Sequence, residues 1–307
     1  MQKKLSRSVA PKASIVWVDG RYVPMAKANV PILTHSLHYG SAVYEGIRFY
    51  KTKNGTAVFR LSDHLARFFR SARAMGMHLP YTTAQLTDVA RTLVKKNKLS
   101  EGYLRPLAYY GSRMGMAPVG CPVHVALATW SWPQHFETKA IRVHCSSIRW
   151  RDPASIVFNT KVSGYYATSI LATLEAKKFG YDEAILLDAK GYVTEGPVEN
   201  IFMVKKGRLY TPHAASVLPG ITRDTIFSLA RKSGIKVIEK NITLAELKKA
   251  DEVFFCGTAV EITPVSQVDN QKIGNGKAGA LTLKFQESYR KIVHAGDSKY
   301  TKWLTIV

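Results

Sequence analysis

Residues 158–169 read FNTKVSGYYATS and place one lysine, Lys161, among apolar, small and aromatic side chains. No acidic residue lies within this stretch to pair with the amine. A lysine attacks a carbonyl carbon only after its amine has lost its proton, and apolar surroundings favour the neutral amine. The stretch therefore suits a lysine that forms an imine with a carbonyl cofactor. Taken alone, it is more simply a lysine that reaches solvent from the end of a strand.

The composition is that of a large globular protein. The chain has 307 residues and is 46% hydrophobic, which is enough to bury the core of one large or two moderate domains. It contains no uninterrupted apolar run of the roughly 18 residues that a membrane-spanning helix needs, so we expect no membrane association. Residues 1–14 are basic and lack the apolar run of a secretory signal. We expect them to form a flexible arm, with a short transit segment as the alternative.

The charge is strongly positive, with 44 lysines and arginines against 22 acids and a formal net charge of +22. Such a charge is consistent with binding to nucleic acid or to anionic metabolites. The basic residues are spread along the chain without a nucleic-acid-binding motif, so we expect no nucleic-acid partner. Cys121, Cys145 and Cys256 lie in apolar runs and form no CxxC or zinc pattern. They indicate free thiols in a reducing cytosol, a cytoplasmic location and no bound metal.

The first part of the chain reads as hairpins followed by helices. Residues 15–23 and 46–61 alternate in hydrophobicity around an Asp-Gly and an Asn-Gly pair, which favour two-residue turns. Ser62 is expected to cap the next helix and Gly76 to end it. We expect two helices and then two strands here, at 63–76, 83–97, 103–111 and 122–130.

Residues 130–139, WSWPQHFETK, break this pattern with a proline and polar residues. We take 131–139 as the linker between a small α+β domain at 15–130 and a larger α/β domain at 140–307. Strands and helices alternate in the larger domain, as is typical of an α/β fold. Its expected strands lie at 141–148, 183–188, 200–212 (a hairpin), 235–240 and 253–259. Its expected helices lie at 164–179, 222–233, 244–250 and 278–294.

Two turns have the composition of phosphate-binding sites. In LPGITRDTI (218–226) a helix is expected to start near Gly220, with Thr222 as its N-cap, and the unpaired N–H groups of a helix start favour an anion. Gly257 and Thr258, in CGTA, end an apolar strand in a second turn of this kind. Taken alone, each is more simply an ordinary capped helix or tight turn.

Two charged side chains complete the set. Arg60 lies between a strand and a helix, where a planar guanidinium can bind phosphate through two hydrogen bonds, although a surface position is equally compatible. Glu195 follows a turn, and a carboxylate beside a pyridine nitrogen keeps that nitrogen protonated, so that the ring accepts electrons. Alone, Glu195 is an ordinary turn acid. Together with Lys161 and the two turns, these residues match the requirements of pyridoxal 5′-phosphate (PLP).

Longer motifs now identify a family resemblance. In chain order they are LTHSLHYGSAVYEGIR (33–48), Arg60, YLRP (103–106), Lys161, GYVTEGPVENIF (191–202), LPGITRDTI (218–226) and FFCGTAVEITPV (254–265). The chain resembles the branched-chain amino acid aminotransferases among the class IV, fold-type IV PLP enzymes. The resemblance runs from about residue 15 to the closing KYTKWLTIV (299–307), and it implies the D-amino-acid aminotransferase-like fold.

The resemblance implies a role for each part of the cofactor site. Lys161 would form the imine with PLP and then move the proton between the substrate Cα and the cofactor C4′. Tyr166 would hydrogen-bond the phenolic oxygen, and Glu195 the pyridine nitrogen. The phosphate-binding set implied by the family is Arg60, Gly220, Ile221, Thr222, Gly257 and Thr258.

The resemblance also implies how the substrate binds. Tyr103 and Arg105 would hold its carboxylate; without the family they would read as ordinary polar groups of a strand. The N–H groups of Thr258 and Ala259 would help them. The implied pocket residues of the small domain are Tyr39, Tyr44, Gly46 and Arg48. The implied reaction transfers the amino group of L-leucine, L-isoleucine or L-valine to 2-oxoglutarate. The implied assembly is a homodimer or larger, in which loop 111–120 closes the pocket of a neighbouring subunit.

Three departures from the family pattern concern the substrate more than the fold. Tyr165 stands where relatives often have asparagine, and Pro197-Val198 occupies a stretch that is usually rich in glycine. The linker lacks a frequent tyrosine, whose place His135 or Phe136 would take. A D-amino-acid aminotransferase, an (R)-amine transaminase or an aminodeoxychorismate lyase of the same fold therefore remain alternatives. A basic binding protein that keeps the fold without catalysis is a fourth.

Overall fold

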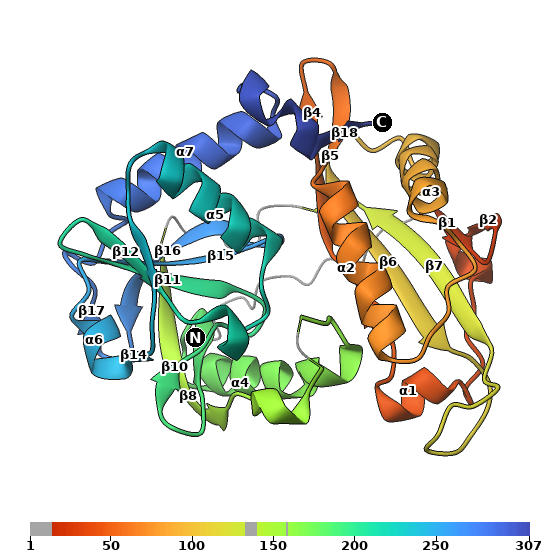
Figure 1. The fold of residues 1–307 in the computed structure, drawn as a ribbon, viewed down its shortest axis with the longest axis horizontal. Coiled ribbons are helices and arrows are strands. Elements are labelled where there is room, and N and C mark those ends of the chain that lie inside the picture. The colour runs from red at the N-terminus through yellow and green to blue at the C-terminus, as the bar shows by residue number, and fades with distance from the viewer. Residues whose placement is uncertain (1–13, 133–139, 158) are drawn as a thin grey trace.

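The computed structural model describes residues 14–132, 140–157 and 159–307, and these form two β-sheets that each carry helices (Figure 1). The first sheet is eight-stranded in the order β18-β5-β4-β6-β7-β1-β2, with β3 paired to β6. The second is ten-stranded in the order β13-β12-β11-β15-β16-β8-β9-β10-β14, with β17 paired to β16. The expected α/β architecture is confirmed.

The first sheet and its helices come mainly from the N-terminal part of the chain. Its strands are β1 (Ile15–Val18), β2 (Arg21–Pro24), β3 (Val43–Tyr44), β4 (Ile47–Thr52), β5 (Gly55–Phe59), β6 (Gly102–Tyr110), β7 (Val123–Trp130) and β18 (Leu304–Ile306). Its α-helices are α1 (His35–Tyr39), α2 (Leu61–Ala74) and α3 (Thr83–Lys96), and a 3-10 turn η1 covers Met25–Lys27. The hairpins and helices expected here are confirmed, apart from shifts of one or two residues.

The second sheet is built from the rest of the chain. Its strands are β8 (Ile141–Arg149), β9 (Glu183–Leu187), β10 (Tyr192–Val193), β11 (Asn200–Lys205), β12 (Arg208–Thr211), β13 (Val237–Glu239), β14 (Ile242–Thr243), β15 (Glu252–Gly257), β16 (Glu261–Val268) and β17 (Gln271–Lys272). Its α-helices are α4 (Tyr166–Lys178), α5 (Ile221–Lys232), α6 (Leu244–Lys248) and α7 (Ala280–Val293). The 3-10 turns are η2 (Pro153–Ser155), η3 (Ser163–Tyr165), η4 (Ala214–Ser216) and η5 (Ser298–Trp303). Strand β16, which lies in the middle of this sheet, was not among the strands expected from the sequence.

Helix α2 packs one face on the first sheet because its apolar residues recur at helical spacing. Leu61, Leu65, Phe68 and Ala72 are all buried in the core of this domain. The expected N-cap, Ser62, is wrong: it lies within the first turn, and the capping residue is Arg60, in a left-handed conformation with φ of 51°. Side-chain capping is therefore absent at this end of α2.

The domain boundary expected at 140–307 needs one correction. Strand β18 pairs antiparallel with β5, with Leu304 opposite Phe59, so the last residues of the chain return to the first sheet. A run of alternating polar and apolar residues at a terminus does not say which sheet edge it joins. The expected arm at 1–14 and linker at 131–139 lie almost entirely outside the described residues. In the part of the chain that is described, no helix is long and apolar enough to cross a membrane.

The two domains are joined by a buried arginine. The guanidinium of Arg48 lies 3.2 Å from Glu101 in its own domain and 3.1 Å from Glu261 at the start of β16. It also stacks 4.9 Å from the ring centre of Tyr50. The Tyr50 hydroxyl donates a hydrogen bond of 2.8 Å to Glu261. Arg48 therefore fixes one domain against the other.

We predict that Arg48→Met lowers the free energy of unfolding by about 1–3 kcal/mol, because it leaves two carboxylates without their cation. The two carboxylates keep some solvent, so the loss stays below that of a fully buried pair. The matched control is Lys291→Met, whose pair with Glu287 is exposed and lies within one helix, and which should change stability by less than about 0.5 kcal/mol. Urea unfolding measures both; equal values for the two variants would contradict the structural role of Arg48.

Candidate active site

Lys161 is held at the junction of the two domains. Its backbone N–H donates to the Ser71 hydroxyl on α2 at 2.9 Å, and its carbonyl accepts from the N–H of Tyr44 at 3.1 Å. An isolated bridge between Val43 and Val162 continues this pairing. The first domain therefore sets the backbone position of a lysine that enters the second domain.

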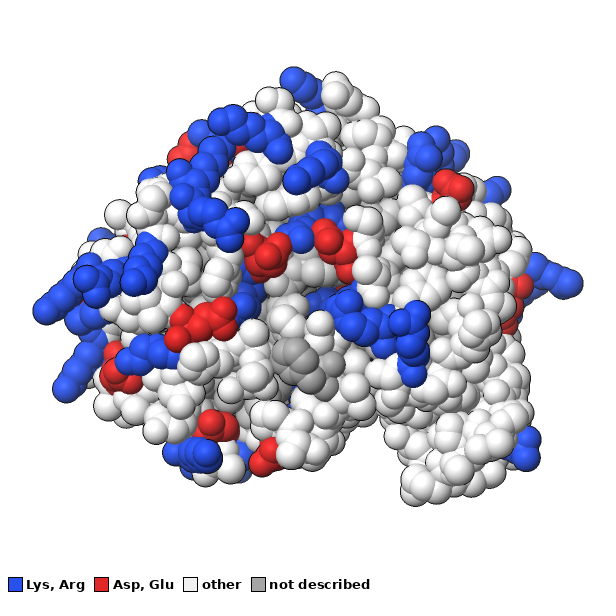
Figure 2. Space-filling view, viewed as in Figure 1, with Lys and Arg blue, Asp and Glu red and all other residues white. Residues whose placement is uncertain are grey.

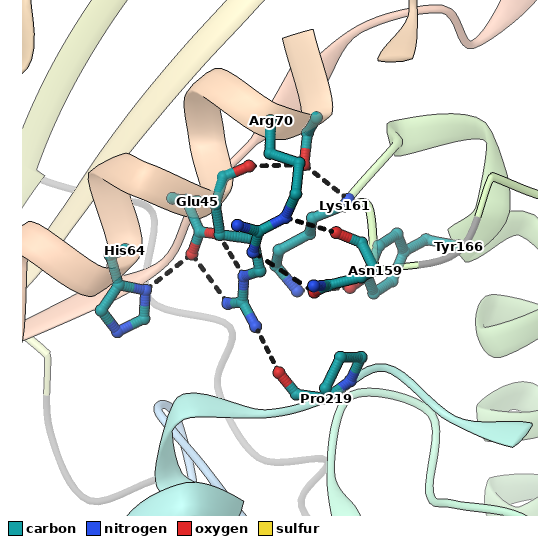
Figure 3. Close-up of polar contacts among 9 residues, drawn as sticks. Glu45, His64, Arg70, Asn159, Lys161, Tyr166 and Pro219 are labelled. Atoms are coloured by element: carbon teal, nitrogen blue, oxygen red, sulfur yellow. Dashed lines mark hydrogen bonds and ion pairs between the residues drawn. The ribbon is translucent and has the colours of Figure 1, made fainter. Parts of the chain in front are cut away.

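The amine of Lys161 lies against two aromatic rings. It donates a hydrogen bond to the Tyr166 hydroxyl, and its nitrogen lies 4.9 Å from the Tyr44 ring centre and 4.7 Å from that of Tyr166. The surrounding protein disfavours a charged phenolate and raises the pKa of Tyr166 to about 12. Tyr166 is therefore a neutral phenol that can hold the lysine in place (Figure 3).

Glu195 is a buried carboxylate, 4% exposed, that lines the same cavity as Lys161. It accepts hydrogen bonds from the Asn200 amide at 2.9 Å and from the N–H of Leu218 at 3.2 Å. Burial raises the pKa of Glu195 to about 8, against the opposing effect of nearby cations, of which Arg151 is the strongest. A positively charged group placed beside Glu195 would favour its ionised form.

The turn before α5 leaves N–H groups free at one end of the cavity. The expected N-cap, Thr222, is wrong: the capping residue is Gly220, and α5 begins at Ile221. A Cβ at Gly220 would lie 2.1 Å from the Asn200 side-chain oxygen, so only glycine allows this approach. The N–H groups of Ile221 and Thr222 belong to the first turn of α5 and have no partner within the helix. They can bind an anion.

Arg67, which the sequence analysis missed, lines the cavity beside this turn. It forms hydrogen bonds of 2.6 and 2.9 Å with Glu45 and donates to the carbonyl of Pro219 at 3.2 Å (Figure 3). Burial opposes ionisation of Glu45, but Arg67 and His64 outweigh it and hold the pKa of Glu45 well below its usual range. The buried Glu45 carboxylate thus fixes the arginine at the cavity wall.

Arg60 lies outside the cavity, contrary to our expectation. Its guanidinium makes hydrogen bonds of 2.6 Å to Asp63 and 2.6 Å to Asp224, and it stacks 4.7 Å from the Trp303 ring. Its side chain reaches α5, where it also donates to the Ile221 carbonyl at 3.3 Å. The strand-to-helix position that drew attention to Arg60 does not fix the direction of its side chain, and Arg67, two turns into α2, lines the cavity together with Ile221 and Thr222.

Another part of the cavity wall is aromatic and basic. The Arg105 guanidinium stacks on the rings of Tyr44, at 4.7 Å, and Tyr103, at 5.6 Å. Among the described residues its buried Nε has no hydrogen-bond partner and its charge forms no ion pair. Gly46 makes room for this arrangement, since a Cβ there would lie 1.9 Å from the Tyr103 hydroxyl. A carboxylate would satisfy Arg105.

Two expected pocket residues lie elsewhere. Tyr39 is 40% exposed and packs on His35, outside the cavity. Arg48 points into the interdomain contact described above. Both residues belong to the motif at 33–48. The chain turns at Gly40 (φ of 63°), directly after Tyr39. The alternation of side chains along β4 directs Arg48 away from the cavity.

The remaining expected residues come together in one cavity of about 210 Å³. They are Tyr44, Gly46, Tyr103, Arg105, Lys161, Tyr166, Glu195, Gly220, Ile221, Thr222, Gly257, Thr258 and Ala259. The lining residues that were missed or not given a role are Arg67, Trp132, Trp150, Pro197, Val198, Glu199, Asn200, Leu218 and Cys256. Arg67 was detectable in the sequence, because with His64 and Ser71 it recurs at helical spacing beside the apolar residues of the buried face of α2.

The cavity therefore joins four chemical functions. An amine and a carboxylate line one cavity together with Arg67, the first-turn N–H groups of α5 and Arg105, which forms no ion pair among the described residues. The unpaired Arg105 and the N–H groups of α5 each require an anion. The residues present thus fit a phosphorylated pyridine aldehyde together with a carboxylate substrate.

Comparisons with known proteins agree with this geometry. The family described as Amino-transferase class IV matches residues 42–268. The chain is 43% identical over 305 residues to the branched-chain-amino-acid aminotransferase of Pseudomonas aeruginosa, covering 98% of this chain and 99% of that protein. It is 38% identical over 286 residues to the enzyme of the same name from Escherichia coli K12, covering 91% and 92%.

Solved structures show the same likeness. The branched-chain aminotransferase from Thermoproteus uzoniensis with norvaline matches with a TM-score of 0.92 at 40% identity, covering 95% of this chain and 99% of that one. The Escherichia coli enzyme matches with a TM-score of 0.93 at 38% identity, covering 95% and 99%. The chain belongs to the class IV aminotransferases and, within them, to the branched-chain amino acid aminotransferases.

We predict that Glu195 makes the stability of the cofactor-free chain depend on pH. Because the pKa of Glu195 is raised, the folded chain keeps a proton between pH 4.5 and about pH 8 that the unfolded chain releases. The stability that this proton contributes is complete below this pH range and is lost as the pH rises through it. Glu195→Gln should remove a slope of about 1.4 kcal/mol per pH unit. Urea unfolding at several pH values measures the difference.

Other buried acids are the same in both chains, so the comparison isolates Glu195. Glu287→Gln is the matched control, because Glu287 is exposed and paired with Lys291. If the wild-type and Glu195→Gln chains had parallel pH profiles, Glu195 would not be a protonated acid in the cofactor-free chain.

Proposed function

We propose that the chain is a PLP-dependent aminotransferase that moves the amino group of L-branched-chain amino acids to 2-oxoglutarate, giving branched-chain 2-oxo acids and L-glutamate. The observation that carries this proposal is that Lys161, Glu195, the α5 turn and Arg105 all line one cavity. The named relatives and solved structures are branched-chain amino acid aminotransferases, which supports the substrate class.

Each side chain of the cavity has a place in this reaction. When bound, PLP supplies an electron-accepting ring that stabilises negative charge at the substrate Cα. Lys161 anchors the cofactor and then takes the proton from Cα and returns it at C4′. Tyr166 orients the lysine amine and donates to the phenolic oxygen. Glu195 holds the proton on the ring nitrogen.

Two further groups hold the cofactor's phosphate and the substrate. Arg67 and the N–H groups of Ile221 and Thr222 face the phosphate position, with Gly257 and Thr258 across the cavity. Arg105 binds the α-carboxylate, with Tyr103 beside it. Tyr44 and Trp132 supply apolar wall area for a branched side chain. This arrangement favours a branched-chain substrate over the donors of the alternative fold-type IV enzymes.

We predict that a panel of donors identifies the substrate. L-leucine with 2-oxoglutarate should react fastest among L-leucine, D-alanine and (R)-1-phenylethylamine, each tested with 2-oxoglutarate and with pyruvate. Lys161→Ala should lower turnover by about 10³-fold or more, because the proton carrier is lost. Steady-state rates measure both. A strong reaction with D-alanine and none with L-leucine would contradict the proposed substrate class. Full activity of Lys161→Ala would contradict the role of Lys161 as the proton carrier.

We predict that Arg67, and not Arg60, binds the phosphate of PLP. Arg67→Lys keeps the charge beside Glu45 but loses the planar two-point contact, so PLP should bind roughly tenfold more weakly. Arg60→Lys is the matched control and should bind PLP as the wild type does. Titration of the cofactor-free proteins gives the dissociation constants. A larger loss in Arg60→Lys than in Arg67→Lys would restore Arg60 to the site.

We also propose a homodimer as the minimum assembly. An apolar surface of the first domain lies exposed around α1 and loop 111–120. Its members are Ile32, Leu33, Leu37, Met116 and Val119, which are 56–80% exposed. Tyr39, at the end of α1, is also exposed, at 40%. Sedimentation velocity should give at least twice the mass of one chain, and Leu37→Asp with Met116→Asp should lower this mass; a monomeric wild type would contradict the proposal.

The distribution of basic side chains over the surface does not indicate another ligand. Figure 2 shows lysines and arginines spread over both domains on this face, with acidic residues among them. Their spread agrees with the sequence and supports no further partner.

A further inference from the structure

Glu261 closes a hairpin whose turn lines the cavity. Strand β15 ends at Gly257 and β16 begins at Glu261, and these two residues are paired across the hairpin. The turn between them consists of residues 258–260. Thr258 and Ala259 line the cavity, as Gly257 does, whereas Glu261 does not. Glu261 therefore shapes this part of the cavity wall without contacting its contents.

The N–H groups of Thr258 and Ala259 can bind an anion. Among the described residues, neither N–H donates a hydrogen bond to a group outside this hairpin. Successive N–H groups in a turn form a concave site that favours negative charge. The Arg105 guanidinium, which also requires an anion, lines the same cavity. The direction of these two N–H groups therefore affects how tightly a carboxylate binds in the cavity.

The backbone of Glu261 has an unusual conformation. Its φ of 55° is in the left-handed region, which a residue other than glycine adopts at an energetic cost and keeps only when contacts around it hold it there. Two such contacts come from the second domain. The Thr263 hydroxyl donates to the carbonyl of Val260 at 2.8 Å, and the Gln286 amide donates to the carbonyl of Ile262 at 2.8 Å. They hold the backbone on either side of Glu261.

The side chain of Glu261 is held by the first domain. One of its carboxylate oxygens lies 3.1 Å from the Arg48 guanidinium and accepts a hydrogen bond of 2.8 Å from the Tyr50 hydroxyl. Arg48 and Tyr50 are two positions apart on one face of β4. Both are buried, and neither lines the cavity. The carboxylate thus ties the left-handed residue to a strand of the other sheet.

We propose that Glu261 is a positioning residue for substrate binding. Arg48 and Tyr50 hold its carboxylate, and this contact fixes the turn so that the N–H groups of Thr258 and Ala259 point at the carboxylate of the substrate. The inference rests on the proposed function. The amino acid and the 2-oxo acid both carry this carboxylate. Glu261 therefore acts on the binding of both substrates and not on proton transfer.

Four variants separate this role from a general effect on the fold. Glu261→Gly removes the carboxylate but suits the left-handed backbone. Glu261→Gln keeps an oxygen that can accept from Arg48 and Tyr50. Tyr50→Phe removes one of the two donors. Glu101→Gln is the matched control, because it removes the other carboxylate beside Arg48, at 3.2 Å, which belongs to the first domain.

The probe is 4-methylvaleric acid, a branched carboxylic acid without an amino group, titrated calorimetrically into each PLP-loaded enzyme. Glu261→Gly should bind it about tenfold more weakly, which is the effect of one poorly aligned hydrogen bond to a charged group. Tyr50→Phe and Glu261→Gln should bind it roughly threefold more weakly. Glu101→Gln should bind it as the wild type does.

Steady-state kinetics give a second readout that a merely structural role would not produce. In Glu261→Gly the KM values for L-leucine and for 2-oxoglutarate should both rise about tenfold, while kcat stays within about twofold, because binding is lost equally in the ground state and the transition state. A fall in kcat with unchanged KM values would overturn the proposal.

Unchanged binding of 4-methylvaleric acid in Glu261→Gly, or an equal loss in Glu101→Gln, would also overturn it. Tyr50→Phe loses only a hydroxyl group, so it decides the question if Glu261→Gly does not fold: binding as in the wild type would then overturn the role of Glu261. Failure of the wild type to bind PLP or to react with L-leucine would instead reject the proposed function, whatever the variants show.

Discussion

The structure depends on how the backbone of Lys161 is anchored. Its N–H is bonded to Ser71 on α2 and its carbonyl to the N–H of Tyr44, so the first domain holds a residue whose side chain serves a cavity shared with the second. A flexible lysine has several rotatable bonds, and catalysis requires its nitrogen to be placed within a fraction of an ångström. Two backbone hydrogen bonds across the domain junction supply that placement.

Buried charges arrange the rest of the cavity around this lysine. Glu45 lies fully buried behind Arg67 and fixes that arginine beside the α5 turn, where an anion is expected. Glu195 lies buried among neutral donors, where it favours a cationic partner. Arg105 is stacked on aromatic rings without a carboxylate of its own in the described chain. The anion site beside Arg67, the carboxylate of Glu195 and the guanidinium of Arg105 each match one charged group of PLP or of an amino acid substrate. The geometry therefore favours this function.

The sequence predicted the architecture well because hydrophobic periodicity and turn residues are local signals. It located the expected strands and helices of both domains and most of the cavity. It failed where the outcome depends on contacts far apart in the chain. Arg60 and Arg48 have suitable positions in the sequence, but acidic partners on α2 and α5 hold the first and strand alternation directs the second away from the cavity. Arg67 acquires its role only through Glu45 and the distant α5 turn, and β18 joins a sheet formed some 250 residues earlier.

The most direct test is a crystal structure of the chain grown with PLP. We expect continuous electron density from the Lys161 nitrogen to the cofactor, with a Glu195 oxygen within hydrogen-bonding distance of the ring nitrogen and the phosphate against the first turn of α5. Density that places the cofactor elsewhere, or leaves the Lys161 amine free while PLP is bound, would contradict it.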